Sequence, residues 1–456
     1  MNFKGKIFYK EQEGYEEARI GRVFNHRRPH RYPVAVFFPA DEEDVVTAVK
    51  FAKENEYKIA IRAGGHSWAA WSVRDEGILL DLKHLDKISL NTETNIVSAG
   101  PAVKGGDELN PFLKEHGLFF NGGHCPTVGI GGFLLQGGQG WNARGWGWSA
   151  EYIVAIDVVT ANGELVRADA THRADLFWAA RGAGPGFFGV VTCFHLKAKA
   201  YPKALTASTY IYPSQYMPTV LSWIQNIHQT IKTTVEMVAV GQTFDFGEGI
   251  VVHALAFEDD YDEAKKALAP FENCPVIDKA VVHKSALPTS IAAECATQIK
   301  MNPELHRWAV SNAWLQGSNE KVIAAIQDSF KNFPSKKTFT LWFSMAPMRP
   351  LPDMAFSLQT EVYFAVYSVW ENEAEDTNCL QWVKEQIKRI EPVTAGQYLG
   401  DSDFTADQRK FMSEENWVKL QEIRKKYDPE SLFHSYLSNS TADLNKNIWN
   451  RQLSNL

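Results

Sequence analysis

The sequence predicts a two-domain α+β protein, and three observations support that prediction. The chain has 456 residues, which is too long for one compact core and suits two domains. Hydrophobic residues make up 45% and charged residues 22%, as in ordinary globular proteins. Glycine-bounded apolar runs fill the first part of the chain, whereas aromatic strands and amphipathic helices fill the rest. We therefore expect an α+β domain over 1–200, a second domain with its own sheet and covering helices over 201–413, and a closing segment over 414–456.

The elements of the first domain follow from short apolar runs. AVFF, KIAIRAGG, GILLDL, NIVSAG and the long VGIGGFLLQGGQG stretch are bounded by Gly, Asn or Asp, which is typical of strands. DEEDVVTAVKFAKENEYK has an acidic first turn and apolar residues at Val45, Val49 and Ala52, which predicts an amphipathic helix. Asn162 and Gly163 separate two apolar runs and predict a hairpin turn.

The second domain differs from the first in amino-acid composition. Its aromatic-rich runs KTFTLWFSM and EVYFAVYSVW predict strands, and they are mixed with the predicted helices YMPTVLSWIQNIHQTI, EKVIAAIQDSFKNF and CLQWVKEQIKRI. In the closing segment, WVKLQEIRKKYDPESLF predicts a helix that ends before Pro429, because proline disfavours helical backbone at the residue before it.

Composition excludes several classes of function. Forty-seven basic against 54 acidic residues give a net charge of −7, so no basic field is present to hold nucleic acid or an anionic membrane. The polar N-terminus and the absence of a long apolar window predict a soluble, cytoplasmic protein. Five cysteines without a Cys-x-x-Cys pair argue against a disulfide framework. One sequon, Asn439 to Thr441, would permit glycosylation if the chain were exported.

Two glycine-rich segments are the main candidates for a binding site. They are RAGGHSW at 62–68 and NGGHCPTVGIGGFLLQGGQG at 121–140. Dense glycine serves left-handed backbone or close backbone approach, and successive N–H groups in such turns bind anions without a basic side chain. A cofactor with a pyrophosphate would fit. Gly184-x-Gly186-x-x-Gly189 matches a dinucleotide-binding pattern, but it leads into the strand-like VVTCFHL, which favours a strand-entry loop over an NAD site.

His66 and Cys125 are nucleophiles within these two segments. As isolated residues, each would more often be a packed core or loop side chain. A metal site of His66, His124 and Cys125 lacks a fourth ligand and a carboxylate, so we expect no metal. A Cys–His hydrolase with Cys125 as nucleophile and His66 as base remains an alternative, whereas His124 adjoins Cys125 and would point to the opposite face of a strand.

RAGGHSW, GGHCPTVGIGG and DLFWAARGAGPGFFGVV together resemble the berberine bridge enzyme-like flavoproteins of the vanillyl-alcohol oxidase superfamily. YEEARIGRVFNHRRPHRYP, PADEEDVVTAVKFA and KKYDPESLF follow that family's pattern in the same order, so the resemblance covers nearly all of 15–200 and 390–434. The resemblance implies a PCMH-type FAD-binding domain into which an antiparallel-sheet substrate domain covered by helices is inserted. The closing segment, 414–456, would return to the FAD-binding domain.

The resemblance also implies a bicovalent FAD, with His66 bonded to the flavin 8α-methyl group and Cys125 to C6. Val128 takes the position of the family's oxygen gate, where Val accompanies oxidase behaviour. The remaining implied FAD contacts lie around the pyrophosphate, the ring and the ribityl chain: Arg62, Ala63, Gly64, Gly65, Ser67, Pro126, Thr127, Gly129, Gly131, Gly132, Gln139, Gly189 and Val190.

Tyr398 and Tyr363 are the implied catalytic residues. Tyr398 lies in QYLGD, which resembles a family motif that carries the base, although a tyrosine pKa of about 10 requires a cationic or hydrogen-bonding neighbour to lower it. Loss of such a base predicts that Tyr398→Phe slows flavin reduction by about a hundredfold or more. Packing is the alternative role. An aromatic pocket is expected from Tyr363, Tyr367, Trp370 and Tyr398.

Three residues depart from the pattern of the plant-type members, so the catalytic mechanisms of those members should not be transferred to this chain. Trp68 and Gln139 replace tyrosines of the plant-type members, and Ala365 falls where they have a catalytic Glu or Gln. We therefore expect an oxidase that takes two electrons from a C–OH or C–N carbon of a secondary metabolite or sugar, with molecular oxygen as acceptor and H2O2 as product. The alternatives are the Cys–His hydrolase and a catalytically silent flavin-binding protein.

Overall fold

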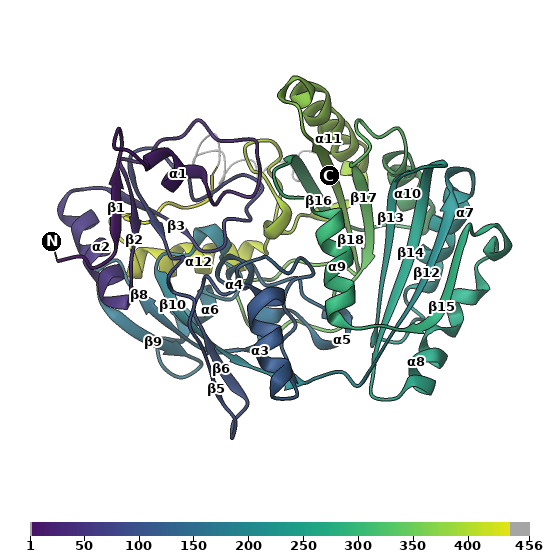
Figure 1. Cartoon of the computed structure of the whole chain (residues 1–456), viewed down its shortest axis with the longest axis horizontal. Helices are drawn as coiled ribbons and strands as arrows, with labels where there is room; N and C mark the ends of the chain where they lie inside the picture. The colour runs from purple at the N-terminus through teal and green to yellow at the C-terminus, as the bar shows by residue number, and fades with distance from the viewer. Residues whose placement is uncertain (1, 438–456) are drawn as a thin grey trace.

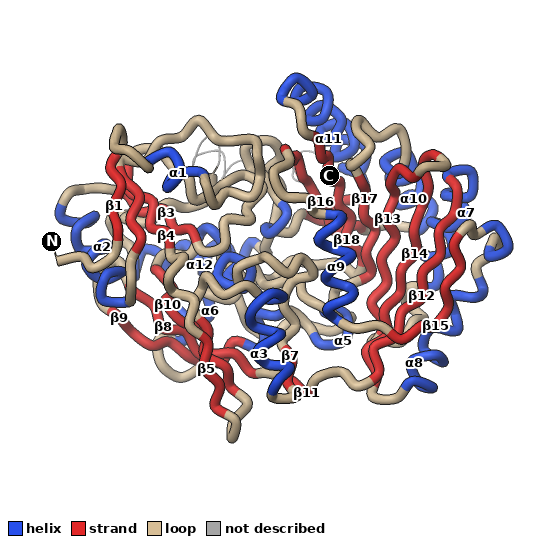
Figure 2. The backbone as a smooth tube through the Cα atoms, in the orientation of Figure 1, coloured by secondary structure: helices blue, strands red, loops and turns tan. Residues whose placement is uncertain are grey.

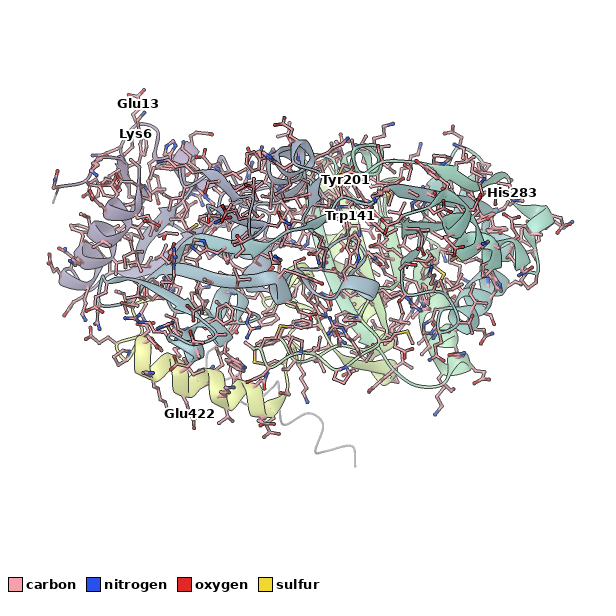
Figure 3. All side chains as sticks on the ribbon, turned by 90° about the horizontal axis from the view of Figure 1, so that it is seen from below. Lys6, Glu13, Trp141, Tyr201, His283 and Glu422 are labelled. Carbon is pink, nitrogen blue, oxygen red and sulfur yellow. The ribbon has the colours of Figure 1, made fainter. Side chains whose placement is uncertain are left out.

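The computed structural model describes residues 2–437, so the sequon at 439–441 lies outside the described residues. Figure 1 shows two halves side by side, with the N-terminal elements in one half and a broad sheet in the other. The helix α12 (Glu414–Tyr427) lies with the N-terminal elements, and Figure 3 shows it with Glu422 along one edge of the molecule. None of the described helices combines the length and apolarity needed to cross a bilayer.

The first sheet of the N-terminal half has the order β1 (Lys6–Tyr9), β2 (Ala35–Phe38), β4 (Gly77–Asp81), β3 (Lys58–Arg62). β2, β4 and β3 are parallel, and α2 (Glu42–Glu54) forms the crossover from β2 to β3. The side chain of Asp41 caps α2 by accepting a hydrogen bond from the backbone N–H of Asp44. Val45, Val49 and Ala52 are buried, which confirms the amphipathic helix predicted there. The short helix α1 (Tyr15–Ile20) packs beside this sheet.

The second sheet is antiparallel and has the order β5 (Ile88–Asn91), β6 (Ile96–Ala99), β10 (Val190–Lys197), β8 (Ile153–Val159), β9 (Leu165–Asp169). The β8–β9 hairpin turns at Asn162 and Gly163, and Gly163 has φ of 70°, so the predicted hairpin is confirmed. Hydrophobic residues of this sheet, of α6 (Ala174–Ala179) and of α12 share one core.

Short elements connect the two sheets to the rest of the chain: α3 (Asn110–Glu115), β7 (Leu118–Phe119) paired with β11 (Lys199–Ala200), α4 (Ile130–Leu135) and α5 (Ala143–Trp146). The strand-like reading of VGIGGFLL was wrong, because Ile130–Leu135 is helical. Ile130 and Leu134, four positions apart, are both buried in the same core, which is the spacing of one helix face.

The second half is built on one antiparallel sheet, ordered β15 (Val282–Pro288), β12 (Ala204–Pro213), β14 (Gly247–Glu258), β13 (Val235–Phe244), β17 (Phe339–Ser344), β18 (Val362–Trp370), β16 (Arg307–Leu315), β19 (Thr394–Gly396). Four helices pack on one face: α7 (Met217–Ile227), α8 (Tyr261–Leu268), α10 (Asn319–Ile326) and α11 (Asp376–Ile390). The helix α9 (Ile291–Met301) packs instead toward the N-terminal half, as Figure 2 shows.

Alternation along β18 divides its side chains between two cores. Tyr363, Ala365 and Tyr367 lie in the core that faces the N-terminal half. Trp370 lies in the opposite core with the covering helices, where its indole Nε1 donates to Asp376 at 2.7 Å. The expectation that Trp370 lines the pocket was therefore wrong, because it lies an odd number of residues from Tyr363 and Tyr367.

The domain boundaries at 200 and 413 stay predictions. The strands of the large sheet run from Ala204 to Gly396. After this sheet, Leu399, Phe404 and Phe411 already pack into the core of the N-terminal half. The segment just before α12 thus contacts both halves.

Candidate functional site

A cavity of about 380 Å³ lies between the two halves. The N-terminal half contributes both glycine-rich segments to its walls, and the large sheet contributes side chains from β13, β17 and β18. The chain returns to this cavity with Tyr398, Asp401 and His434. Trp141, which Figure 3 places between the halves, is also on the wall.

Most of the residues predicted for the site line this one cavity: Arg62, Ala63, Gly64, Gly65, His66, Ser67, Cys125, Val128, Gly129, Gly131, Gly132, Gln139, Gly189, Tyr363 and Tyr398. Three do not. Val190 is fully buried and pairs with Val159 in the β10–β8 ladder. The buried Pro126 uses its carbonyl to accept from the N–H groups of Gly106 and Asp107. Thr127 is also absent from the wall, but its side-chain hydroxyl contacts two residues that line it.

That hydroxyl joins the two predicted nucleophiles. Thr127 Oγ1 lies 3.0 Å from His66 Nε2 and 3.5 Å from Cys125 Sγ. The ring of Phe24 stacks on the His66 imidazole, with 4.4 Å between centroids and 21° between planes. His66 and Cys125 are 59 positions apart in the sequence, and the two glycine-rich segments hold them on one wall.

Burial sets the protonation of both nucleophiles. Loss of solvation, together with the charge of Lys104, lowers the pKa of His66 to about 4, so its imidazole is neutral at neutral pH. Burial raises the pKa of the Cys125 thiol, and the hydrogen bonds with Thr127 oppose that shift. A Cys–His hydrolase would need the thiolate form of Cys125, whereas this environment favours a neutral thiol beside a neutral imidazole.

The glycines have two separate roles. A Cβ at Gly64 would lie 2.6 Å from the backbone nitrogen of Gly129, so the two segments can touch only through glycine backbone. A Cβ at Gly132 would meet nothing within 4 Å, and Gly132 lines the cavity. Its missing side chain therefore leaves space that a flat or extended cofactor can occupy.

The Arg62 side chain is engaged within the protein, so the expected contact of residues 62–67 with a pyrophosphate stays a prediction that would use backbone groups. Its Nε donates to Asp81 Oδ2 at 2.6 Å, and both side chains are fully buried. Its Nη1 donates to the carbonyl of Arg19 at 2.6 Å. Arg62 therefore fixes the end of β3, and only its backbone can contribute to the cavity wall.

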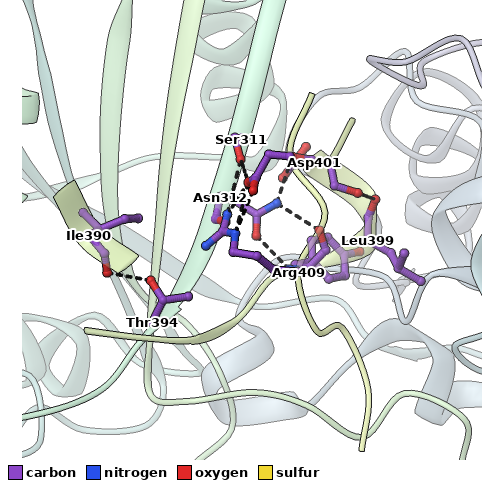
Figure 4. Close-up of polar contacts among 10 residues, drawn as sticks. Ser311, Asn312, Ile390, Thr394, Leu399, Asp401 and Arg409 are labelled. Atoms are coloured by element: carbon purple, nitrogen blue, oxygen red, sulfur yellow. Dashed lines mark hydrogen bonds and ion pairs between the residues drawn. The ribbon is translucent and has the colours of Figure 1, made fainter. Parts of the chain in front are cut away.

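Tyr398 reaches the cavity from a turn that is held by β16. The Asn312 side chain accepts from the Tyr398 N–H at 2.7 Å and donates to the carbonyls of Tyr398 and Asp401, at 2.9 Å and 2.8 Å. Figure 4 shows Asn312 at the centre of these contacts. The phenol oxygen of Tyr398 accepts from the backbone N–H of Gln139 at 3.3 Å.

The surroundings of Tyr398 do not activate it as a base. Burial, and then the charge of Asp401, raise its pKa far above the ordinary value, and the backbone hydrogen bonds from Gln139 and Gly138 only partly offset them. No described lysine or arginine acts on its phenol. The base role inferred from the sequence thus lacks the cationic neighbour that it needs.

Asp401 is the main site residue that the sequence interpretation missed. Its Oδ2 accepts from the Tyr363 hydroxyl at 2.7 Å, and its Oδ1 accepts from Trp68 Nε1 at 2.9 Å. Asp401 is the last residue of the QYLGD motif, and this motif was the sequence signal that could have identified it. The contact with Trp68 spans 333 positions and leaves no local pattern in the sequence.

Two further carboxylates on the cavity wall were also missed. Glu236 on β13 accepts from His124 Nε2 at 2.9 Å and from the backbone N–H of Asn142 at 2.7 Å. Glu294 on α9 lies 3.2 Å from His253 Nε2. His124 is thus paired with Glu236 rather than with its neighbour Cys125.

Comparison with known proteins defines the class. The sequence profile of the FAD binding domain matches residues 33–169, so the chain is a flavin-binding protein. The FAD-linked oxidoreductase ptmO of Penicillium ochrochloron is 34% identical over 426 residues, which cover 92% of this chain and 94% of that protein.

Solved structures share the fold. 6-Hydroxy-D-nicotine oxidase of Arthrobacter nicotinovorans superposes with a TM-score of 0.84 at 21% identity, over 96% of this chain and 98% of that one. Berberine bridge enzyme of Eschscholzia californica gives 0.82 at 18% identity, over 95% and 96%. The chain therefore belongs to the FAD-linked oxidoreductases, and it shares the PCMH-type fold of 6-hydroxy-D-nicotine oxidase and berberine bridge enzyme.

Proposed function

We propose that this oxidoreductase is an oxidase that holds FAD covalently through His66 and Cys125. It removes a hydride from a carbon that bears OH or NH, and it passes the two electrons to molecular oxygen, giving H2O2. The observation that carries the proposal is the shared Thr127 hydroxyl, which holds both nucleophilic side chains on one wall of the cavity.

The two side chains suit attachment for different reasons. The lowered pKa of His66 leaves its imidazole neutral, with a lone pair available to form a bond to carbon. Cys125 must lose its proton to react, and Thr127 offers the nearest hydrogen-bonding group for that change. Phe24 restrains the orientation of the His66 ring by stacking on it.

The remaining residues would hold the cofactor and the substrate. FAD supplies the hydride acceptor when it is bound. Backbone N–H groups of Gly64 and Gly65 would hold its pyrophosphate, because the Arg62 side chain is engaged elsewhere. Val128, which lies on the wall, would border the path of oxygen. Tyr398 would donate its hydroxyl proton in a hydrogen bond to the substrate, and Tyr363 would fix Asp401.

Intact mass of the denatured protein tests this proposal. One FAD should remain on the parent and on the single variants His66→Ala and Cys125→Ala, and it should be lost from the double variant. Cys193→Ala is the matched control, because Cys193 lies on β10 and outside the cavity wall.

A parent without bound flavin after denaturation would remove both attachment claims. The Cys–His hydrolase would then be tested by alkylating Cys125 in the colourless protein. Flavin that stays attached but is reduced by no candidate alcohol or amine would instead support a catalytically silent flavin-binding protein. Production of one H2O2 for each substrate oxidised supports the oxidase.

A further inference from the structure

Asp401 is a carboxylate at the cavity wall without a cationic partner among the described residues. Its two oxygens accept from Tyr363 and Trp68, which are neutral donors. No lysine, arginine or histidine of the described chain forms an ion pair with it, whereas most other buried or partly buried carboxylates, such as Asp81 and Asp376, have one. A partly buried charge without a counter-charge is costly, so its retention at the cavity points to a ligand that supplies the opposite charge.

The rest of the described wall offers no free guanidinium or ammonium group. Arg62 is the one arginine or lysine among the described lining residues, and its guanidinium is bonded to Asp81 behind the wall. Glu236 and Glu294 also line the cavity, and each lies beside a histidine, His124 and His253 respectively, so Asp401 is the carboxylate of the described wall without such a partner. In a low-dielectric cavity, a carboxylate without an ion-pair partner attracts a cation and repels an anion before any close contact forms.

Aromatic rings surround Asp401. Trp68 and Tyr367 lie with 5.9 Å between ring centroids, and Tyr363 and Tyr398 with 6.4 Å, and all four rings line the cavity. Aromatic rings and a carboxylate on one cavity wall form a binding site suited to an alkylammonium group, because both the ring quadrupole and the carboxylate can favour positive charge.

We propose that the substrate of this oxidase is an amine that enters as a cation, with Asp401 as its counter-charge and proton acceptor. This inference rests on the proposed function and selects C–N over C–OH at the reacting carbon. Burial holds the pKa values of Tyr363, Tyr367 and Tyr398 far above the ordinary range, so these phenols stay protonated. An ammonium proton can pass to a carboxylate, whereas an alcohol proton requires a stronger base than these groups provide.

The atoms and electrons balance as follows. Asp401 takes one N–H proton from the ammonium group and leaves the amine with its lone pair. That pair forms the C=N bond while the adjacent C–H bond breaks, and the hydride passes with two electrons to the bound FAD. Oxygen would then take the two electrons and two protons, one delivered with the hydride and one held by Asp401, and become H2O2, and the product would leave as an iminium ion.

Calorimetric titration of the flavin-loaded protein with three probes of similar shape tests the inference: benzylamine, benzyl alcohol and benzoate. The parent should bind benzylamine at least about tenfold more tightly than benzyl alcohol, and benzoate most weakly. Asp401→Asn should reduce the preference for the amine to less than about threefold, and Asp401→Glu should keep it, which separates lost charge from misfolding. Asp403→Asn is the matched control, because Asp403 bonds to Thr405 and does not line this cavity.

Benzyl alcohol binding as tightly as benzylamine in the parent would overturn the inference, and so would an amine preference that survives Asp401→Asn. Because calorimetry needs no turnover, these outcomes are separate from the flavin attachment measured by mass. A flavin-carrying protein that prefers the alcohol would overturn this inference alone, whereas a protein without attached flavin would overturn the proposed function whichever probe it prefers.

Discussion

At the scale of single residues, Tyr398 has the expected position on the cavity wall but not the protonation state that a catalytic base requires. Its side chain lies on the cavity wall, where the resemblance suggested, but its oxygen accepts a backbone hydrogen bond and its pKa is raised by burial and by Asp401. A protonated phenol can orient a substrate by donating a hydrogen bond, and it cannot remove a proton.

Tyr398→Phe should therefore slow flavin reduction by about tenfold, the cost of one neutral hydrogen bond, rather than the hundredfold expected for a lost base. Because the pKa of Tyr398 lies above its ordinary value, the phenol does not titrate near neutral pH, and the pH profiles of parent and variant should be parallel from about pH 6 to 9. Stopped-flow measurement of flavin reduction by a surrogate substrate gives both the rate and its pH profile. Tyr427→Phe, which changes a phenol bonded to Asp175 outside the cavity, is the control. A hundredfold loss with an altered profile would restore the base role.

The sequence could place His66 and Cys125 because both stand in glycine segments whose local pattern is distinctive. It could not place Asp401 beside Trp68, because that contact joins distant parts of the chain through tertiary packing. Placing Trp370 in the pocket from the sequence was wrong. The alternation of side chains along a strand, counted from Tyr363, already puts Trp370 on the other face of the sheet.

At the scale of elements, the Arg62 side chain anchors the end of β3 through contacts with Asp81 and with the carbonyl of Arg19. The ion pair with Asp81 joins the ends of two parallel strands, and the glycine segment with His66 begins directly after it. The conformation of that segment thus depends on a buried pair outside the cavity. The local sequence predicted the strand KIAIR and the glycine turn, but the direction of one side chain at their junction is decided by Asp81, 19 positions away.

Arg62→Met should lower the free energy of unfolding by about 3–5 kcal/mol, because it leaves the buried Asp81 short of one partner. Urea denaturation measures this change. Arg167→Met is the matched control: Arg167 pairs with Asp157 at 2.7 Å but is 57% exposed, so its loss should cost less than about 1 kcal/mol. If Arg62→Met released FAD without changing stability, the guanidinium would have to contact the cofactor after all.

At the scale of the whole molecule, the cavity is shared by both halves, so a ligand there should stabilise them together. Addition of FAD to the flavin-free His66→Ala/Cys125→Ala protein, at about a hundred times its Kd, should stabilise the fold by about 2.7 kcal/mol. Calorimetric melting should show one transition that moves to higher temperature. Two transitions, of which only one moves, would mean that the flavin contacts a single half.

The cavity wall also depends on segments that lie far apart in the sequence. It includes the backbone that follows β3, the rings on β18, and finally His434 and Ser435. A chain cut before residue 434 would lack part of this wall. We therefore expect flavin binding to need the fold to be complete through residue 435, and not the N-terminal half alone.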